Sequence, residues 1–270
     1  MSGSELRDAV AIVTGASSGI GRATALALAI RGSVVVAASR NHEALCSLEK
    51  EIVASGGKVC IMLTDVTLKD QVRRLVQEAV RQFGRIDIAV CNAGAYLRRR
   101  VVDLKIEDYE RIMAVNFYGA LNLIHEVLPH MLQRRRGHIA VVSSIDGKKG
   151  LPPDGAYVAS KFAINGVMDV LRQELRGTGV YATTVLPGRV DTPMIATLKV
   201  PPISAKVSSK RVARAIVRGI EKRRAEVVVP YLGPKTLVVL STLWPRLGDW
   251  LVRVCGLEGR VYDPGGGKPS

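Results

Sequence analysis

The sequence has few aromatic residues and lacks a long apolar run. Aromatic residues make up 4% of the 270 residues. A core with so few rings must consist mainly of Val, Leu, Ile and Ala, which suits a parallel sheet covered by helices on both faces. No run of 18 uncharged apolar residues occurs, so no helix is expected to span a bilayer. The first residues lack the basic start and apolar stretch of a signal peptide. We therefore expect a cytoplasmic protein, with association to a membrane surface left open.

Cysteines are also few, and their spacing matches no metal site. The four are Cys46, Cys60, Cys91 and Cys255. They lie too far apart in the chain for the ligand spacings of structural zinc sites, so no bound metal is predicted. Cys60 and Cys91 fall in apolar segments and are predicted to be buried thiols. This pattern indicates a reducing compartment.

Acidic residues are outnumbered, with 24 Asp and Glu against 39 Lys and Arg, a formal net charge of +15. Such a balance is compatible with nucleic acid, a membrane surface or an anionic ligand as partner. The basic runs at 98–100, 134–136 and 222–224 are scattered, without interleaved aromatic residues or a nucleic-acid-binding motif. We interpret each run as solvated surface and predict no nucleic-acid partner.

Short segments rich in Val and Ile alternate with helical patterns from residue 9 onward. These segments are apolar almost without interruption, as expected for strands buried on both faces. Strands are predicted at 9–13, 34–38, 58–63, 86–90, 138–142, 180–186 and 226–230, and helices at 19–31, 42–55, 69–83, 106–133, 157–176 and 205–222. The alternation predicts an α/β fold with a single domain: a doubly wound, Rossmann-like sheet of seven parallel strands with helices on both faces. This domain is predicted to span 1–232, followed by an apolar helical extension at 233–262 and a disordered Gly/Pro-rich tail at 263–270.

A glycine-rich turn follows the first predicted strand. The sequence TGASSGIG at residues 14–21 runs directly into a helical pattern. Glycines let the backbone turn tightly and approach a pyrophosphate, whose charge rests on the N–H groups that begin the helix. A purely structural turn also favours glycine, but the spacing TGxxxGxG is more specific than glycine content alone. The predicted cofactor contacts of this loop are Gly15, Ser17, Ser18, Gly19, Ile20 and Gly21.

The residues after the second predicted strand indicate which dinucleotide binds. An acidic side chain at this position would hold the ribose hydroxyls of NAD, whereas a 2′-phosphate requires the acid to be absent and a cation to be present. Ser39 occupies the acidic position and Arg40 follows it. The sequence therefore predicts NADP(H) as cofactor.

A tyrosine and a lysine lie four residues apart at the start of a predicted helix. Tyr157 and Lys161, in YVASK, fall on the same helix face. An ammonium beside a phenol favours the phenolate, so we expect Lys161 to lower the pKa of Tyr157 and make it a proton donor and acceptor. Ser144, thirteen residues earlier at a strand end, is predicted to bind the substrate oxygen.

Together these motifs resemble the short-chain dehydrogenase/reductase family, in an NADP(H)-preferring form. The resemblance covers roughly residues 10–192. The motifs, in the family's order, are TGASSGIG, Asp65-Val66, CNAG at 91–94, Asn116, Ser144, YVASK, and Pro187-Gly188 followed by Thr192. Cys91 departs from the pattern, because family members often carry Asn there. That position mainly supports the sheet, so little functional effect is expected.

The resemblance implies roles for residues that the spacing alone does not explain. Asp65 and Val66 would contact the adenine. Asn116 would hold a water that links Lys161 to a proton relay, and Lys161 would also bind the nicotinamide ribose. The remaining implied cofactor contacts are Asn92, Ala93 and Gly94 on the floor of the site, Pro187, Gly188 and Thr192 beside the carboxamide, and Val190.

The predicted activity is hydride transfer between NADP(H) and a carbonyl or alcohol carbon, with Tyr157 as general acid and base. A lipophilic ketone or aldehyde is the preferred substrate class: a ketoacyl compound, a steroid-like ketone or a fatty aldehyde. The alternatives are an alcohol dehydrogenase that runs oxidatively and a catalytically silent cofactor-binding scaffold or sensor. Substrate identity is expected to depend on residues 145–155 and 194–204. The family resemblance further implies a homodimer or homotetramer.

An apolar stretch at 233–256 contains both tryptophans of the chain, Trp244 and Trp250. Pro245 is expected to break or kink a helix there. Three interpretations remain open at this point: a core or subunit-interface helix, a lid over a lipophilic substrate, or a segment that lies on a membrane surface.

Overall fold

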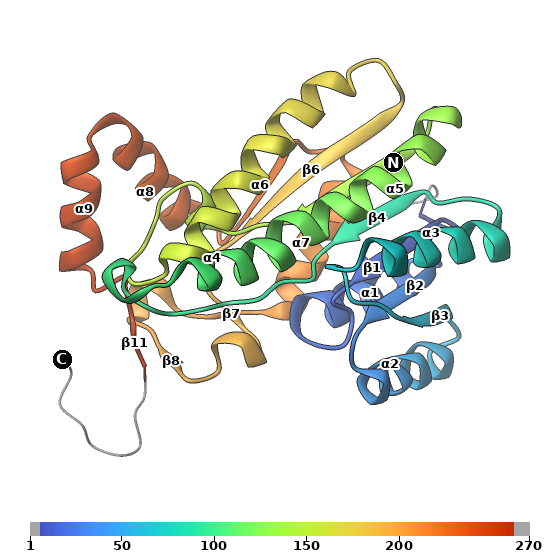
Figure 1. The fold of residues 1–270 in the computed structure, drawn as a ribbon, viewed down its shortest axis with the longest axis horizontal. Helices are drawn as coiled ribbons and strands as arrows, with labels where there is room; N and C mark the ends of the chain where they lie inside the picture. Colours follow the sequence, from blue (N-terminus) through green and yellow to red (C-terminus); the bar gives the residue numbers. More distant parts are fainter. Residues whose placement is uncertain (1–5, 262–270) are drawn as a thin grey trace.

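A parallel sheet of seven strands forms the centre of the structure, a computed structural model that describes residues 6–261 (Figure 1). Its strands are β1 (Val10–Thr14), β2 (Val34–Ser39), β3 (Lys58–Leu63), β4 (Ile88–Cys91), β5 (Gly137–Val142), β6 (Val180–Pro187) and β10 (Glu226–Val229). Their spatial order is β10-β6-β5-β4-β1-β2-β3, and neighbouring strands are parallel. The predicted doubly wound α/β fold is confirmed.

Helices cover both faces of this sheet. One face carries α1 (Gly19–Ile30), α2 (His42–Ala54) and α7 (Ser209–Glu221), and the other carries α3 (Lys69–Phe83), α5 (Gly119–Gln133) and α6 (Gly155–Glu174). Side chains of β1 alternate between the two cores, with Ala11 and Val13 in one and Val10 and Ile12 in the other. Every residue of such a strand is buried whichever face it points to, which explains the unbroken apolar segments in the sequence.

The strand order reverses beside β1. The chain runs outward from β1 to β2 and β3, then crosses to β4 on the other side of β1 and continues toward β10. Connections therefore leave the carboxyl ends of β1 and β4 in opposite directions. In doubly wound sheets this reversal opens the crevice in which ligands bind.

Two predicted helices differ most from the observed ones in their boundaries. The segment expected to form one helix at 106–133 is divided into α4 (Ile106–Met113) and α5 by a π-helical turn at Ala114–Tyr118. The helix expected from residue 205 begins at Ser209, because Ser208 caps it by accepting a hydrogen bond from the backbone N–H of Arg211.

The chain beyond β10 forms a helical hairpin and then returns to the main body. α8 (Leu232–Leu243) and α9 (Pro245–Val254) pack against each other at one end of the molecule (Figure 1). Pro245 is the first residue of α9, where its missing N–H removes no helical hydrogen bond. β11 (Arg260–Val261) then pairs with β8 (Leu198–Lys199). Residues 262–270, which include the tail expected to be disordered, lie outside the described residues.

A further short pair of strands, β7 (Val190–Asp191) and β9 (Val207–Ser208), lies between β6 and α7 in the chain. Among residues 6–261, no helix combines the length and the apolar character needed to cross a membrane.

Candidate active site

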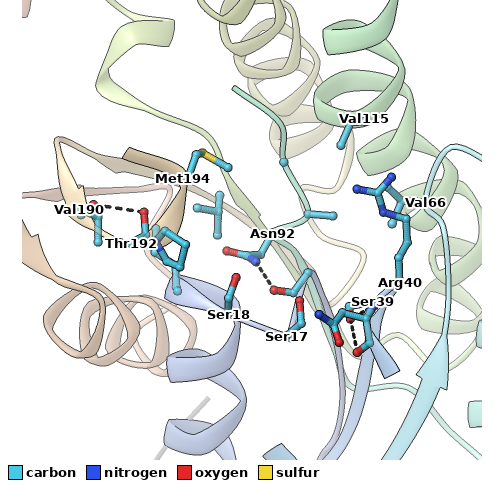
Figure 2. Close-up of a pocket in the computed structure, with 18 of the residues that line it drawn as sticks. Ser17, Ser18, Ser39, Arg40, Val66, Asn92, Val115, Val190, Thr192 and Met194 are labelled. Carbon is cyan, nitrogen blue, oxygen red and sulfur yellow. Dashed lines mark hydrogen bonds between the residues drawn. The ribbon is translucent and has the colours of Figure 1, made fainter. Parts of the chain in front are cut away.

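One cavity of about 640 Å³ opens at the carboxyl ends of the central strands. It gathers most of the residues that the sequence singled out, and Figure 2 shows part of its lining. The predicted residues that line it are Gly15, Ser17, Ser18, Gly19, Ile20, Ser39, Arg40, Asp65, Val66, Asn92, Ala93, Gly94, Ser144, Tyr157, Lys161, Pro187, Gly188, Val190 and Thr192. Gly21 and Asn116 are not part of this lining.

The glycine loop is shaped by contacts that leave no room for side chains. Gly15 has a φ of +64°, and a Cβ on it would lie 2.8 Å from Cα of Ala93. A Cβ on Gly21 would lie 2.2 Å from the carbonyl oxygen of Gly15. Gly21 therefore allows the loop to close on itself without facing the cavity, and the loop backbone at the start of α1 remains open for a phosphate.

Asn92 fixes this loop from the neighbouring strand. Its side-chain Nδ2 donates to the carbonyl oxygens of Thr14 at 3.0 Å and Gly15 at 3.2 Å, and its backbone N–H donates to Thr14 Oγ1 at 3.0 Å. Figure 2 shows one of the hydrogen bonds of the Asn92 amide. These three hydrogen bonds join the ends of β1 and β4. Asn92 thus holds the floor of the cavity in shape.

Ser39 and Arg40 lie at the end of β2, on the rim of the cavity. Ser39 Oγ accepts a hydrogen bond from the backbone N–H of Asn41, which keeps the serine folded against its own turn. The Arg40 side chain is 75% exposed and extends beside Val66, with Nη1 3.7 Å from Asp65 Oδ2 (Figure 2). Burial disfavours the Asp65 carboxylate, but hydrogen bonds from Thr67 and the charge of Arg40 hold its pKa below the usual value. The exposed guanidinium is available to an additional anion.

Tyr157 and Lys161 lie together near the start of α6, at the inner end of the cavity. The ammonium Nζ of Lys161 lies 5.5 Å from the centre of the Tyr157 ring and donates to the carbonyl oxygen of Val142 at 3.0 Å. Burial lowers the pKa of Lys161 to about 8, although the charge of Asp146 opposes that shift.

The pKa of Tyr157 moves in the direction opposite to the sequence-based expectation. Burial raises it above the ordinary value and the Asp146 carboxylate adds to the rise, whereas a hydrogen bond with Ser144 acts against it. The expectation considered only the neighbouring ammonium. It missed the loss of water around the phenol and the acidic side chain close by.

Asn116 lies in the π-helical turn between α4 and α5. Its Oδ1 accepts from the backbone N–H of Ala95 at 2.7 Å, while its Nδ2 donates to the carbonyl oxygen of Ala95 at 3.0 Å and to Ser160 Oγ at 2.9 Å. π-helical turns add a residue to a helix and often occur at functional sites. Here the turn directs Asn116 toward α6, one turn from Tyr157. Its implied role in holding a relay water stays a prediction.

Ser144 bonds to a carboxylate that the sequence-based reasoning did not assign. Its hydroxyl donates to Asp146 Oδ2 at 3.2 Å, and the backbone N–H of Asp146 donates to Ser144 Oγ at 3.1 Å. Burial and the charge of Asp154 raise the pKa of Asp146 to about 6. A serine followed two residues later by aspartate is a common turn pattern, and it was the available sign of this contact.

A second polar group near Tyr157 was also missed. Tyr96 contacts the Tyr157 ring edge to face, with ring centres 5.1 Å apart, and its hydroxyl donates to Asp154 Oδ1 at 2.9 Å. Arg98 lies 3.8 Å from the same carboxylate and is only 16% exposed. The prediction of a solvated run at 98–100 is therefore wrong for Arg98, because this side chain turns inward.

Two arginines of this region bind the chain that follows α9. Arg98 donates to the carbonyl oxygens of Glu258 at 2.8 Å and Gly259 at 2.9 Å. Arg189 donates to the carbonyl oxygen of Leu257. The segment after the hairpin is thereby attached next to the polar group around Asp154.

The cavity has further lining residues that were not predicted. They lie next to predicted ones in the chain or in the segment expected to control substrate choice: Asn41, His42, Glu43, Thr64, Val115, Val142, Ser143, Pro193, Met194 and Ile195. Within the described part of the chain, no cluster of three or more His, Cys, Asp or Glu side chains is arranged to hold a metal ion.

Comparison with known proteins gives consistent matches. The sequence model of the family described as short chain dehydrogenase matches residues 9–201. The 3-oxoacyl-(acyl-carrier-protein) reductase FabG of Thermotoga maritima is 37% identical over 207 residues, which cover 77% of this chain and 83% of that protein. Dehydrogenase/reductase SDR family member 7B of Xenopus tropicalis is 32% identical over 266 residues, 91% of this chain and 85% of that protein.

Two other matches differ in extent. Glycine betaine reductase ATRR of Emericella nidulans is 41% identical over 186 residues, 69% of this chain but only 15% of that much longer protein. Among solved structures, an alcohol dehydrogenase from the archaeon Thermococcus sibiricus, complexed with 5-hydroxy-NADP, superposes with a TM-score of 0.74 at 26% identity. That match covers 82% of this chain and 95% of the archaeal chain.

Proposed function

Because the chain belongs to the short-chain dehydrogenase family and is thus an oxidoreductase with a nicotinamide cofactor, we propose that it is an NADP(H)-dependent carbonyl reductase. The observation that carries this proposal is the cavity that joins the glycine loop, the exposed Arg40 and the pair Tyr157 and Lys161. A catalytically silent scaffold would need the glycine loop to bind the cofactor, but it would not require the Tyr157 phenol beside the Lys161 ammonium. The catalytic assignment of Ser144, Tyr157, Lys161 and Asn116 is part of the proposal.

The residues present fit a dinucleotide with a 2′-phosphate. The backbone around Gly15 and Gly21 is packed too tightly for a side chain, as expected where a pyrophosphate approaches closely. Ser39 leaves no carboxylate beside the ribose, and the Arg40 guanidinium extends from the same rim. The solved structure of the archaeal relative with a hydroxylated NADP supports this assignment.

The chain's own side chains support proton transfer at one oxygen. When bound, the nicotinamide would supply or accept the hydride. Tyr157 donates its proton to the substrate oxygen as negative charge develops there, and Ser144 donates a hydrogen bond to the same oxygen. Lys161, held in place by the carbonyl of Val142, supplies positive charge beside the phenol.

Burial and the Asp146 carboxylate keep the Tyr157 phenol protonated, which is the form that donates in a reduction. A phenol whose pKa lies above its usual value is protonated at neutral pH and can act as an acid without first gaining a proton. Oxidation of an alcohol would require the phenolate, which burial and Asp146 disfavour. We rank reduction above the oxidative alternative because of the NADP(H) assignment, since cells usually keep that cofactor pool reduced.

The substrate class remains a lipophilic carbonyl compound in this proposal. Met194 and Ile195 contribute apolar surface to the cavity, and the similarity to a 3-oxoacyl reductase supports ketoacyl compounds in particular. We also propose a cytoplasmic homo-oligomer in which the α8–α9 hairpin contributes to the subunit interface. The hairpin exposes Leu243, Trp244, Trp250 and Val254, each by more than half of its surface.

A direct test is oxidation of NADPH by the purified protein with a panel of carbonyl compounds. The panel should include a 3-ketoacyl thioester, a steroid ketone and a fatty aldehyde, with NADH in place of NADPH as the control. We expect turnover with at least one carbonyl and a higher kcat/KM for NADPH than for NADH. Binding of NADPH without turnover on any member would favour the scaffold instead.

A further inference from the structure

Ser144 has a single hydroxyl hydrogen, and in the structure it points to Asp146. Ser144 Oγ lies 3.2 Å from Asp146 Oδ2 and accepts the backbone N–H of Asp146 at 3.1 Å. While the carboxylate is ionised it can only accept hydrogen bonds, so it holds this hydrogen. Ser144 then has no hydrogen left for a substrate oxygen. A group assigned to bind the substrate is therefore engaged elsewhere.

The second oxygen of the same carboxyl group is enclosed and has no partner. Asp146 Oδ1 is buried without a hydrogen bond among the described residues. A proton on Oδ1 would create a buried donor with nothing to bind, which costs about 1–3 kcal/mol. A proton on Oδ2 instead turns the existing contact around, because the acid then donates to Ser144 Oγ. The hydroxyl hydrogen of Ser144 is released in that state.

The geometry points to Asp146 as a positioning residue that controls where Ser144 donates its hydrogen. The ionised carboxylate holds the hydrogen, and the protonated acid releases it to the oxygen of the substrate. This inference rests on the proposed reductase function and adds a residue to its site. Asp146 bonds to Ser144 rather than to the reacting atoms, so it positions the Ser144 hydrogen, and its charge acts separately on the pKa of Tyr157.

The surrounding charges place this change within an accessible pH range. Burial and the neighbouring Asp154 carboxylate raise the pKa of Asp146 to about 6, while the Ser144 hydrogen bond, Arg189 and Lys161 favour the ionised form. Tyr157 faces the same carboxylate, whose charge raises the pKa of the phenol, and the phenol also forms a hydrogen bond with Ser144. Tyr96 and Arg98 interact with Asp154 rather than with Ser144. Ser144 is therefore released mainly below about pH 6.

The test compares pH profiles of carbonyl reduction for the wild type and Asp146→Asn. In the wild type, kcat/KM should be higher on the acidic side and fall as pH rises through about 6. Asp146→Asn is neutral at every pH, and its amide can donate to Ser144 Oγ, so its profile should lose this step. At pH above 7 the variant should exceed the wild type about two- to tenfold, the rate equivalent of one neutral hydrogen bond. A variant that keeps the step contradicts the inference.

Two controls separate positioning from a general structural effect. Asp154→Asn removes a neighbouring buried carboxylate that binds Tyr96 and not Ser144. It should move the step to lower pH without removing it, because the Asp154 charge helps to raise the pKa of Asp146. In a Ser144→Ala background, Asp146→Asn should lose the part of its gain that requires the hydroxyl and keep only the effect of the Asp146 charge on Tyr157. A gain from Asp146→Asn that is equally large with and without the Ser144 hydroxyl overturns the inference.

A titration of aspartate carboxyl carbons by NMR makes the test independent of turnover. The Asp146 resonance is identified by its loss in Asp146→Asn and should titrate near pH 6 in the wild type. Ser144→Ala should move its midpoint upward, because the hydrogen bond that favours the carboxylate is gone. An unchanged midpoint refutes the coupling. A shifted midpoint in a protein that reduces no carbonyl would instead support the coupling and disprove the proposed reductase function.

Discussion

A phenol enclosed by protein and close to a carboxylate holds its proton more tightly than a phenol in water. Tyr157 is in this position, since burial and Asp146 both raise its pKa. Lys161 does not reverse the shift, because its own pKa is lowered to about 8 by burial and its Nζ binds the carbonyl of Val142. At the residue scale the site thus keeps Tyr157 protonated, so that the phenol can donate its proton to the developing alkoxide. The charge of Lys161 matters most once negative charge develops on the phenol.

Replacing Tyr157 by phenylalanine removes that acid while almost preserving the volume of the side chain. Turnover of the carbonyl substrate should fall about 10²- to 10⁴-fold, the usual contribution of a general acid. NADPH affinity and thermal stability should change little. The matched control is Tyr96→Phe, because Tyr96 packs against Tyr157 but donates to Asp154. Stopped-flow rates and cofactor titration provide the measurement, and full turnover in Tyr157→Phe contradicts the mechanism.

At the scale of elements, the sequence predicts motifs within one strand–turn–helix segment, but not the contacts between elements that are distant in the chain. The glycine loop and the helix of Tyr157 follow from spacing within a strand–turn–helix unit, where backbone geometry fixes which residues share a face. The helical pattern at 106–133 continues through the π-helical turn, so its extra residue leaves no trace in the periodicity. Asn116 was located by family resemblance alone, and its contacts with Ala95 and Ser160 appear only in the structure.

The polar group around Asp154 shows the same limit more strongly. It brings together Tyr96 and Arg98 from one loop, Asp154 from a second and Arg189 from a third, and these three loops are far apart in the sequence. A single sequence contains no signal for side chains that meet only through tertiary packing. Arg98 even belongs to a basic run whose other members, Arg99 and Arg100, are exposed. Its side chain points inward because it binds the Asp154 carboxylate and the carbonyl groups of Glu258 and Gly259.

The hairpin of α8 and α9 supports a prediction at this scale. Exchanging both exposed tryptophans, Trp244 and Trp250, for serine should reduce the oligomer to smaller species in light scattering, because apolar surface is lost from the proposed interface. The contacts of Arg98 and Arg189 with residues 257–259 are left in place, so the fold should persist. If the hairpin lay on a membrane instead, the oligomeric mass would stay constant and only liposome binding would fall.

Truncation at Gly233 is the complementary experiment. It removes the carbonyl groups that Arg98 and Arg189 bind, and both guanidinium groups are partly buried. The loss of these acceptors should cost about 1–3 kcal/mol for each guanidinium, although Arg98 keeps its contact with Asp154 and Arg189 its hydrogen bond to Ser204. We therefore expect a clear loss of thermal stability from truncation that the double tryptophan variant does not show. Equal stability of the truncated and full chains would contradict the anchoring role of the segment after α9.

At the scale of the whole molecule, a chain with a net charge of +15 should favour the more anionic of the two dinucleotides. A ligand that binds only the folded state stabilises it by about 2.7 kcal/mol at 100 times its Kd, which raises Tm by roughly 5–10 °C in a chain of this size. The Arg40 contact with the 2′-phosphate should contribute about 1.5–3 kcal/mol of affinity. NADH at the same concentration should therefore stabilise the fold by about 1.3 kcal/mol or less.

Arg40→Ala should reduce the Tm shift caused by NADPH toward the shift caused by NADH. The Tm of the free protein should not change, since Arg40 is exposed and lies 3.7 Å from its nearest carboxylate oxygen. Equal shifts for both cofactors in the wild type would show that the positive charge and Arg40 do not select NADP(H).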